Sequence, residues 1–320
     1  MKLSIAAAAM LAACAAHAQN YPTKPIRFVV PFAPGGGADL VARTVGHKLT
    51  EALGQPVIVD NRTGAAGSIG AEVVAKSPPD GYTLLLGSSG PLAINPSLYP
   101  RLPYDAARDF APISLATIMP FLLVVHPTLP VHNVKELVAL AKSRPNQLNY
   151  ASPGAGSTTH LANELLKSMT GMKIVHIPYK GVAPAAVDLI SGQVQMMAGD
   201  LSSLIPHMKS NRMRALAVTG AKRSHLLPAV PTVAESGVPG YEASGWFGVL
   251  VPAATPAAVQ ERLNGAIVKG LAANDARERL GAFGGEAGGS TPEQFAAHIR
   301  GEAAKWGKLI KSLGLKADQG

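Results

Sequence analysis

The sequence predicts an α/β protein built from two lobes that two long strands connect. Apolar strand-like runs alternate with helical patterns over most of the 320 residues, which is typical of largely parallel sheets. Two apolar stretches, 113–125 and 246–251, separate the alternating units and suit strands that cross between lobes. The length allows two domains of ordinary size. We therefore expect a discontinuous first lobe, residues 19–120 plus 246–320, and a second lobe of residues 121–245.

The first 18 residues have the pattern of an export signal. Lys2 gives a positive start, residues 3–16 form a short apolar segment, and Ala16-His17-Ala18 fits the small-x-small cleavage rule. The apolar segment is shorter than the roughly 20 residues that span a bilayer. Cleavage after Ala18 predicts a secreted, periplasmic protein. A lipoprotein is the alternative, because Leu11-Ala12-Ala13-Cys14 resembles a box that attaches lipid to Cys14.

The first alternating unit begins with a strand and a helix. Apolar residues recur with helical spacing from Leu40 to Leu53, and Gly54 is a natural stop. The predicted elements of this unit are strand 26–30, helix 40–53, strand 56–59, helix 69–75 and strand 82–86.

The second unit follows the first crossing stretch, which Pro120 interrupts. Its predicted elements are helix 134–142, strand 148–151, helix 157–170, strand 174–177, helix 185–190, strand 194–197 and strand 214–218, and helices 256–271 and 292–313 follow the second crossing. Ligands of open α/β sheets bind beyond the carboxyl ends of the strands. We therefore expect the functional residues in the loops that follow the strands.

Composition excludes several classes of function. The formal net charge is +9, but the basic residues are scattered and no basic run carries interleaved aromatic residues, which argues against nucleic-acid binding. A basic surface can steer anions toward a site, or can serve solubility alone. Cys14 is the only cysteine, so the secreted chain has no disulfide or thiolate ligand. No spaced His/carboxylate cluster or cofactor motif is present, so we expect no metal and no cofactor.

The first candidate loop, residues 31–39, contains three consecutive glycines, Gly35, Gly36 and Gly37. Glycines let backbone N–H groups approach a ligand closely, and the start of the following helix favours an anion. No Lys-Ser/Thr pair follows, which excludes a nucleotide P-loop. The alternative is a tight turn with Asp39 near the helix start.

The second candidate loop, residues 152–160, combines glycines, hydroxyl groups and the start of a helix, and so forms a second anion cradle. Ser157 and His160 lie one helical turn apart, which superficially suggests a nucleophile and its base. No oriented acid accompanies them, and such a histidine is more often structural. A third loop, residues 178–181, offers Tyr179 as a pocket wall.

Together these motifs resemble a known family. The matching residues are 31–39, Asn61 to Gly70, Pro79-Asp80-Gly81-Tyr82-Thr83-Leu84, Ala93 to Tyr99, 103–105, Tyr150 to His160, 177–181, 216–219 and 231–235. They follow the family order over nearly the whole secreted chain. The chain resembles the Bug-type receptors (Bordetella uptake gene, also called TctC) of tripartite tricarboxylate transporters.

The resemblance implies a type II periplasmic binding protein fold with a ligand cleft between its lobes. It also implies a monomeric receptor that captures a small organic carboxylate and delivers it to integral-membrane transporter subunits, with no catalytic residues. Two alternatives stay open: a periplasmic carboxylate sensor, and a hydrolase or lyase that uses His160. The candidate ligand-binding residues are Phe32, Ala33, Pro34, Gly35, Gly36, Gly37, Asp39, Ser88, Ser89, Ser152, Gly154, Gly156, Ser157, Thr158, His160, Tyr179 and Asp200.

Two stretches depart from the family pattern. The family often reads Asn-Thr-Gly-Thr-His where this chain has residues 88–92, and Phe-Asp-Asn where it has residues 198–200. Leu92 and Gly199 thereby replace a histidine and an acid, which predicts a ligand without a free amine and with an apolar body. A one-residue shift would let Asp200 supply the missing charge instead, and both positions facing away from the cleft would remove the argument.

Overall fold

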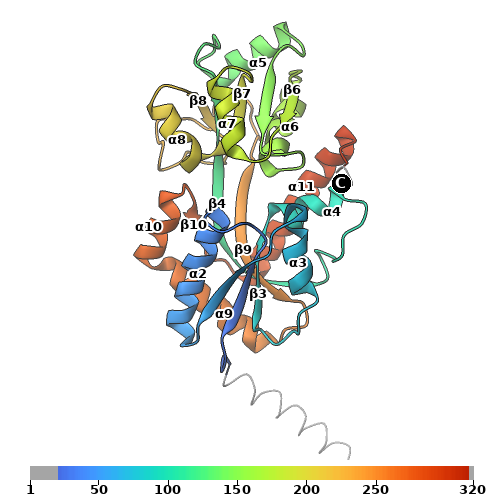
Figure 1. Ribbon diagram of the computed structural model, residues 1–320, viewed down its shortest axis with the longest axis vertical. Helices are drawn as coiled ribbons and strands as arrows, with labels where there is room; N and C mark the ends of the chain where they lie inside the picture. The colour runs from blue at the N-terminus through green and yellow to red at the C-terminus, as the bar shows by residue number, and fades with distance from the viewer. Residues whose placement is uncertain (1–20, 317–320) are drawn as a thin grey trace, which may run out of the picture.

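The computed structural model describes residues 21–316 and has two α/β lobes arranged along its long axis (Figure 1). The predicted signal, residues 1–18 with Cys14, lies outside the described residues. The two-lobed α/β architecture and its two crossing strands are as predicted. We keep the boundaries 19–120 plus 246–320 and 121–245 as a proposal.

The first lobe is built on the parallel strands β2, β1 and β3, in that order in the sheet. Helix α2 begins three residues earlier than predicted, because Gly37, Ala38 and Asp39 already form its first turn. The elements are β1 (Ile26–Val30), α2 (Gly37–Leu53), β2 (Val57–Asn61), η1 (Ala65–Gly67), α3 (Ser68–Ala75), β3 (Thr83–Ser88), η2 (Gly90–Ile94) and α4 (Asn95–Leu98).

The second lobe repeats the alternation around the strand order β7, β5, β6. Helix α8, at residues 201–209, was not predicted, because Pro206 interrupts its helical pattern. The elements are α5 (Val134–Ser143), β5 (Asn149–Ser152), α6 (Thr158–Thr170), β6 (Val175–Pro178), α7 (Val182–Ile190), β7 (Met196–Asp200), α8 (Leu201–Lys209) and β8 (Arg214–Val218).

Two antiparallel strands, β4 (Phe110–Val125) and β9 (Ser244–Pro252), run side by side between the lobes (Figure 1). Their pairing extends from Phe110 opposite Pro252 to Pro120 opposite Ser244. Beyond Pro120, β4 continues into the second lobe and pairs with β7 and β8. The same strand therefore belongs to both sheets, and we call the strand pair that connects the lobes the hinge strands.

The C-terminal part returns to the first lobe through α9 (Ala257–Ala272), α10 (Asn274–Ala282), β10 (Glu286–Ala287) and α11 (Pro292–Leu313). Helix α10 has no periodic apolar pattern and buries only Ala276 and Leu280, so the sequence did not predict it. The long helix α11 also reaches α6 of the second lobe.

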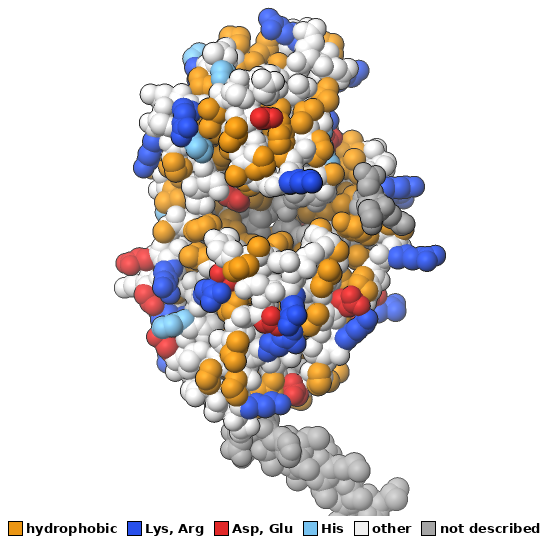
Figure 2. Space-filling view, in the orientation of Figure 1, with side chains coloured by type: hydrophobic (Ala, Val, Ile, Leu, Met, Phe, Trp, Pro, Cys, Tyr) orange, Lys and Arg blue, Asp and Glu red, His pale blue; other side chains and the backbone are white. Residues whose placement is uncertain are grey.

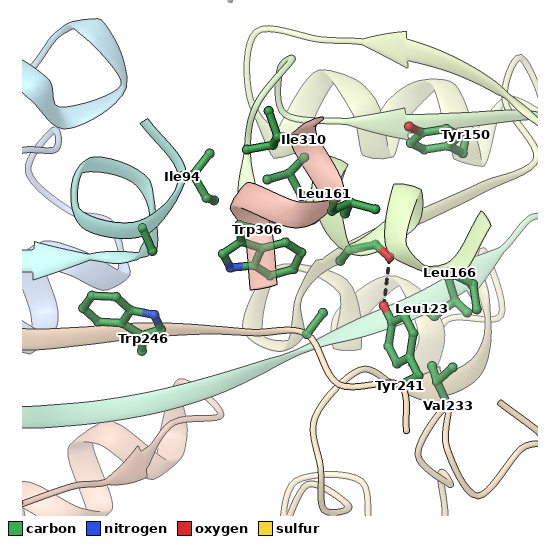
Figure 3. Close-up of a cluster of buried hydrophobic side chains, with 14 of the residues drawn as sticks. Ile94, Leu123, Tyr150, Leu161, Leu166, Val233, Tyr241, Trp246, Trp306 and Ile310 are labelled. Atoms are coloured by element: carbon green, nitrogen blue, oxygen red, sulfur yellow. Dashed lines mark hydrogen bonds between the residues drawn. The ribbon is translucent and has the colours of Figure 1, made fainter. Parts of the chain in front are cut away.

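One buried cluster joins the lobes (Figure 3). Trp306 of α11 is fully buried in it, with Ile94 from the first lobe and Leu161 from the second. In the same cluster Tyr241 donates a hydrogen bond to the carbonyl oxygen of Ala162, at 3.0 Å. The lobes thus share packed apolar surface as well as the strand pair.

Candidate functional site

A cavity of about 330 Å³ lies between the lobes, where Figure 2 shows the surface hollowed. Its walls come from the first candidate loop, the hinge strands, the end of β7 and the end of α10. The lining residues are Phe32, Ala33, Gly36, Gly37, Ala38, Met119, Pro120, Asp200, Leu201, Phe247 and Phe283. The cavity therefore brings together five of the predicted residues, Phe32, Ala33, Gly36, Gly37 and Asp200.

The first loop presents the N-terminus of α2 to this cavity. Gly36 is the N-cap of the helix, and no side chain caps the first turn. The first N–H groups of a helix have no partner within the helix, and they carry its positive dipole end. A Cβ atom at Gly36 would come no closer than 4.0 Å to any neighbouring atom, so glycine leaves open space there. This end of the helix can accept a carboxylate.

Asp39 holds the loop in shape. Its carboxylate accepts hydrogen bonds from the Gly35 N–H at 3.1 Å, Arg43 Nε at 2.8 Å and Asn61 Nδ2 at 3.2 Å. The hydrogen bond from Arg43 holds the pKa of Asp39 below its ordinary value, so the side chain stays ionised. Asp39 is buried and does not line the cavity, and Gly35 has a left-handed backbone with φ +85°. Both residues act as supports of the loop.

The rest of the cavity is largely apolar. Phe32 and Phe247 meet edge to face, with ring centroids 6.2 Å apart, and Met119 and Phe283 add to the same wall. Asp200 is the only ionisable side chain of the lining, and burial raises its pKa. No cationic side chain is present in this lining, so an anion there depends on backbone N–H groups. The sequence did not single out Met119, Leu201, Phe247 or Phe283, because only the lobe arrangement brings them together.

The prediction of a ligand without a free amine, which rests on Leu92 and Gly199, is wrong in its premise. Leu92 is buried in the core of the first lobe. A Cβ atom at Gly199 would lie 2.9 Å from Leu204 Cδ1, so that position faces helix α8 and the core. Asp200, the next residue, lines the cavity. The departures from the family pattern therefore give no reason to exclude an amine.

The second candidate loop lies at another part of the boundary between the lobes. Gly156, with φ +76°, packs so closely against the first lobe that a Cβ atom would lie 2.4 Å from Leu98 Cδ2 of α4. Ser157 caps α6 by accepting a hydrogen bond from the His160 N–H. Neither these residues nor Ser152, Gly154 and Thr158 line the cavity in this arrangement of the lobes.

Behind this loop, three aromatic rings form a stack. His160 and His176 have ring centroids 4.0 Å apart, and Tyr150 stacks on His176 at 4.9 Å. His160 Nδ1 accepts a hydrogen bond from the Gly156 N–H, and His176 Nε2 lies 2.6 Å from Ser152 Oγ. The stack thus holds the loop at two points, Ser152 and Gly156. Sequence reasoning missed His176, because nothing in the spacing links it to the loop.

The stack predicts a loss of stability in acid. Burial, with a smaller contribution from His160, lowers the pKa of His176 from 6.5 to about 4. The unfolded chain therefore binds this proton more readily, and we expect the free energy of unfolding to fall as the pH drops from about 7 toward 4, by on the order of 2 kcal/mol. Urea titrations across this range measure the effect. His176→Gln removes the titrating group, and an equally steep fall in that variant would contradict the assignment.

The remaining candidates have defined places outside the cavity. The hydroxyl groups of Ser88 and Ser89 are buried at the end of β3 and have no hydrogen-bond partner among residues 21–316. Tyr179 donates a hydrogen bond to Asp188 at 2.7 Å, and burial together with this carboxylate raises its pKa to about 12. Pro34 lies exposed in the first loop. Within the described residues no group of three or more His, Cys, Asp or Glu is placed to hold a metal, and no helix suits a membrane span.

Comparison with known proteins gives consistent relatives. Residues 41–315 match the model of the tripartite tricarboxylate transporter family receptor. The protein BugT of Bordetella pertussis is 41% identical over 300 residues, with 93% of this chain and 92% of BugT covered.

Two solved structures from Rhodopseudomonas palustris superpose over most of the molecule. One, bound to adipate, is 40% identical with a TM-score of 0.82 and covers 92% of this chain and 99% of its own. The other, MatC bound to malate, is 31% identical with a TM-score of 0.77 and covers 91% and 100%. These structures confirm the two-lobed periplasmic binding protein fold.

Proposed function

This chain belongs to the tripartite tricarboxylate transporter receptor family, and from that premise we propose that it captures a small organic carboxylate in the periplasm. It then passes the ligand to integral-membrane transporter subunits. It acts as a monomer, without a cofactor and without a catalytic step. The adipate and malate in the two related structures support the ligand class.

The observation that carries this proposal is the pairing of the α2 N-terminus with an apolar wall in one cavity. The carboxylate lies against the N–H groups after Gly36, and the body of the ligand packs on Phe32 and Phe247. Asp200 faces the same space from the second lobe. Since the walls come from both lobes, binding draws the lobes together about the hinge strands.

The same geometry supports binding over hydrolysis. A nucleophile needs its base within hydrogen-bond reach. The Ser157 hydroxyl accepts from the backbone N–H of His160, while the ring Nδ1 of His160 accepts from Gly156. The side chains of Ser157 and His160 thus accept hydrogen bonds from backbone N–H groups of the loop. A sensor would use the same capture chemistry. Identification of the membrane protein that co-purifies with the ligand-bound receptor distinguishes a sensor from a transport receptor.

A thermal-shift panel of mono-, di- and tricarboxylates and aromatic acids tests the proposal. A carboxylate at about 100 times its dissociation constant should stabilise the protein by about 2.7 kcal/mol. The ligand recovered afterwards should be chemically unchanged. A panel in which no acid raises the melting temperature, or in which the bound acid is converted, contradicts the proposal.

Export is part of the same proposal and has its own test. We expect the periplasmic protein to begin at Gln19. Intact-mass analysis of the periplasmic fraction measures this directly. A lipid-modified Cys14 at the N-terminus would instead establish a membrane-anchored receptor, and a retained residue 1 would contradict cleavage.

A further inference from the structure

A second cavity, of about 370 Å³, lies on the opposite face of the hinge strands. Neighbouring residues of a strand point to opposite faces. In β9, Phe247 lines the first cavity, of about 330 Å³, which we call the carboxylate cavity, while Trp246 lines the second one. In β4, Met119 lines the carboxylate cavity and Ile118 lines the second one. The strand pair therefore lies between two cavities that share only Pro120, at the end of the pairing, and we call the second one the rear cavity.

Both lobes form walls of the rear cavity. The second lobe contributes the loop after β8, residues 220–225, and the first lobe contributes Glu286 and His298. At its rim, His225 Nε2 lies 3.0 Å from the carbonyl oxygen of Gly281, which connects the lobes directly. An occupant of this cavity would therefore contact both lobes and favour their present separation.

The floor of the rear cavity contains buried polar atoms with no partner. Trp246 is only 1% exposed, and its Nε1–H has no hydrogen-bond acceptor among residues 21–316. His298 meets the Trp246 ring edge to face at 5.3 Å, and its Nε2 is buried without a partner as well. An unpaired buried donor costs about 1–3 kcal/mol. Such groups in a native protein call for an acceptor, which a bound carboxylate would supply.

The charges of the rear cavity are of both signs and only partly paired. Lys305 forms ion pairs with Glu242 and Glu302, and Arg223 of the lining forms one with Glu235. Within the described chain, Lys222 on the second lobe and Glu286 on the first form no ion pair, and both are exposed. One free cation and one free anion on opposite walls complement a ligand that carries both charges.

We propose that the rear cavity is a second ligand site, which takes a free α-amino acid with an apolar side chain. Trp246 Nε1 and His298 Nε2 donate to its carboxylate, with Lys222 nearby as the positive charge. Glu286 pairs with the ammonium group of the ligand. The apolar side chain of the ligand packs on Ile118 and the Trp246 ring. The site does not depend on the carboxylate cavity, because the strand pair lies between them.

Nuclear magnetic resonance of the two tryptophan indole N–H groups tests this assignment on the exported chain. Trp246→Phe identifies the resonance of Trp246 by its loss. Leucine is the probe, and isocaproate and isoamylamine are its analogues without the ammonium and without the carboxylate. We expect leucine to shift the Trp246 resonance in a saturable manner and each analogue to bind at least about tenfold more weakly, about 1.4 kcal/mol. No shift with leucine, or equal binding of either analogue, overturns the proposal.

Two variants complete the experiment. Lys222→Glu should weaken leucine about tenfold, whereas Lys173→Glu, a charge reversal at an exposed lysine outside the rear cavity, should leave it unchanged. Gly36→Val blocks the carboxylate cavity, and the Trp246 shift should persist in it. Equal losses in both lysine variants, or a shift abolished by Gly36→Val, would also overturn the assignment.

Discussion

Gly36→Val is expected to weaken carboxylate binding by roughly 100-fold, about 2.7 kcal/mol, while the fold stays intact. Gly36 has φ −88° and ψ −179°, an extended conformation that a β-branched residue adopts without strain. A new Cβ atom would meet no neighbour closer than 4.0 Å. The branched side chain would instead fill the space in front of the α2 N–H groups, where the carboxylate is proposed to lie.

Calorimetry with an acid found in the carboxylate panel measures this loss, and urea unfolding measures stability separately. We expect Gly36→Ala to lose less affinity than Gly36→Val, because its methyl group fills less of the space. Binding that survives in Gly36→Val, in a protein of unchanged stability, would place the carboxylate elsewhere. A variant that unfolds would contradict the reading of open space at Gly36.

Trp306→Ala is expected to lower the free energy of unfolding by about 3–5 kcal/mol. Trp306 of α11 is fully buried in the apolar cluster that the two lobes share (Figure 3). Its Nε1–H donates to Glu302 at 2.9 Å, so truncation removes a packed ring and a hydrogen bond to a carboxylate.

Leu313→Ala is the matched control, because Leu313 lies in the same helix and is 39% exposed. Surface changes of this kind usually alter stability by less than about 0.5 kcal/mol. Denaturant titrations of both variants give the comparison. If Trp306→Ala costs no more than Leu313→Ala, the shared cluster does not hold the lobes together.

The two-lobed fold was predictable because its signals are local. Alternating apolar runs and helical spacing define most elements, and the two apolar crossings define the hinge. The start of α2 was placed late, because Gly37 and Asp39 are weak helix formers away from a helix end. Helix α8 was missed because Pro206 lies inside it, although α8 begins directly at the cavity.

The site was predictable only in part. The Gly-rich loop was predictable from Gly35 to Gly37, because glycines before a helix let backbone N–H groups approach an anion closely. Phe283 carries no such signal, because it reaches the cavity only through the return of the C-terminal helices to the first lobe. The prediction from Gly199 failed for a related reason: strand alternation directs Asp200, and not residue 199, toward the cavity.

The central claim is that this receptor recognises a carboxylate through the N–H groups at the start of α2. Calorimetry with one acid from the panel and with its methyl ester, in which every carboxyl group is esterified, tests that claim most directly, because the ester keeps the body of the ligand and replaces each carboxylate by a neutral group one methyl larger. We predict one molecule of acid bound per chain, and an ester at least about 100-fold weaker. An ester that binds as tightly as the acid would contradict carboxylate recognition at this site.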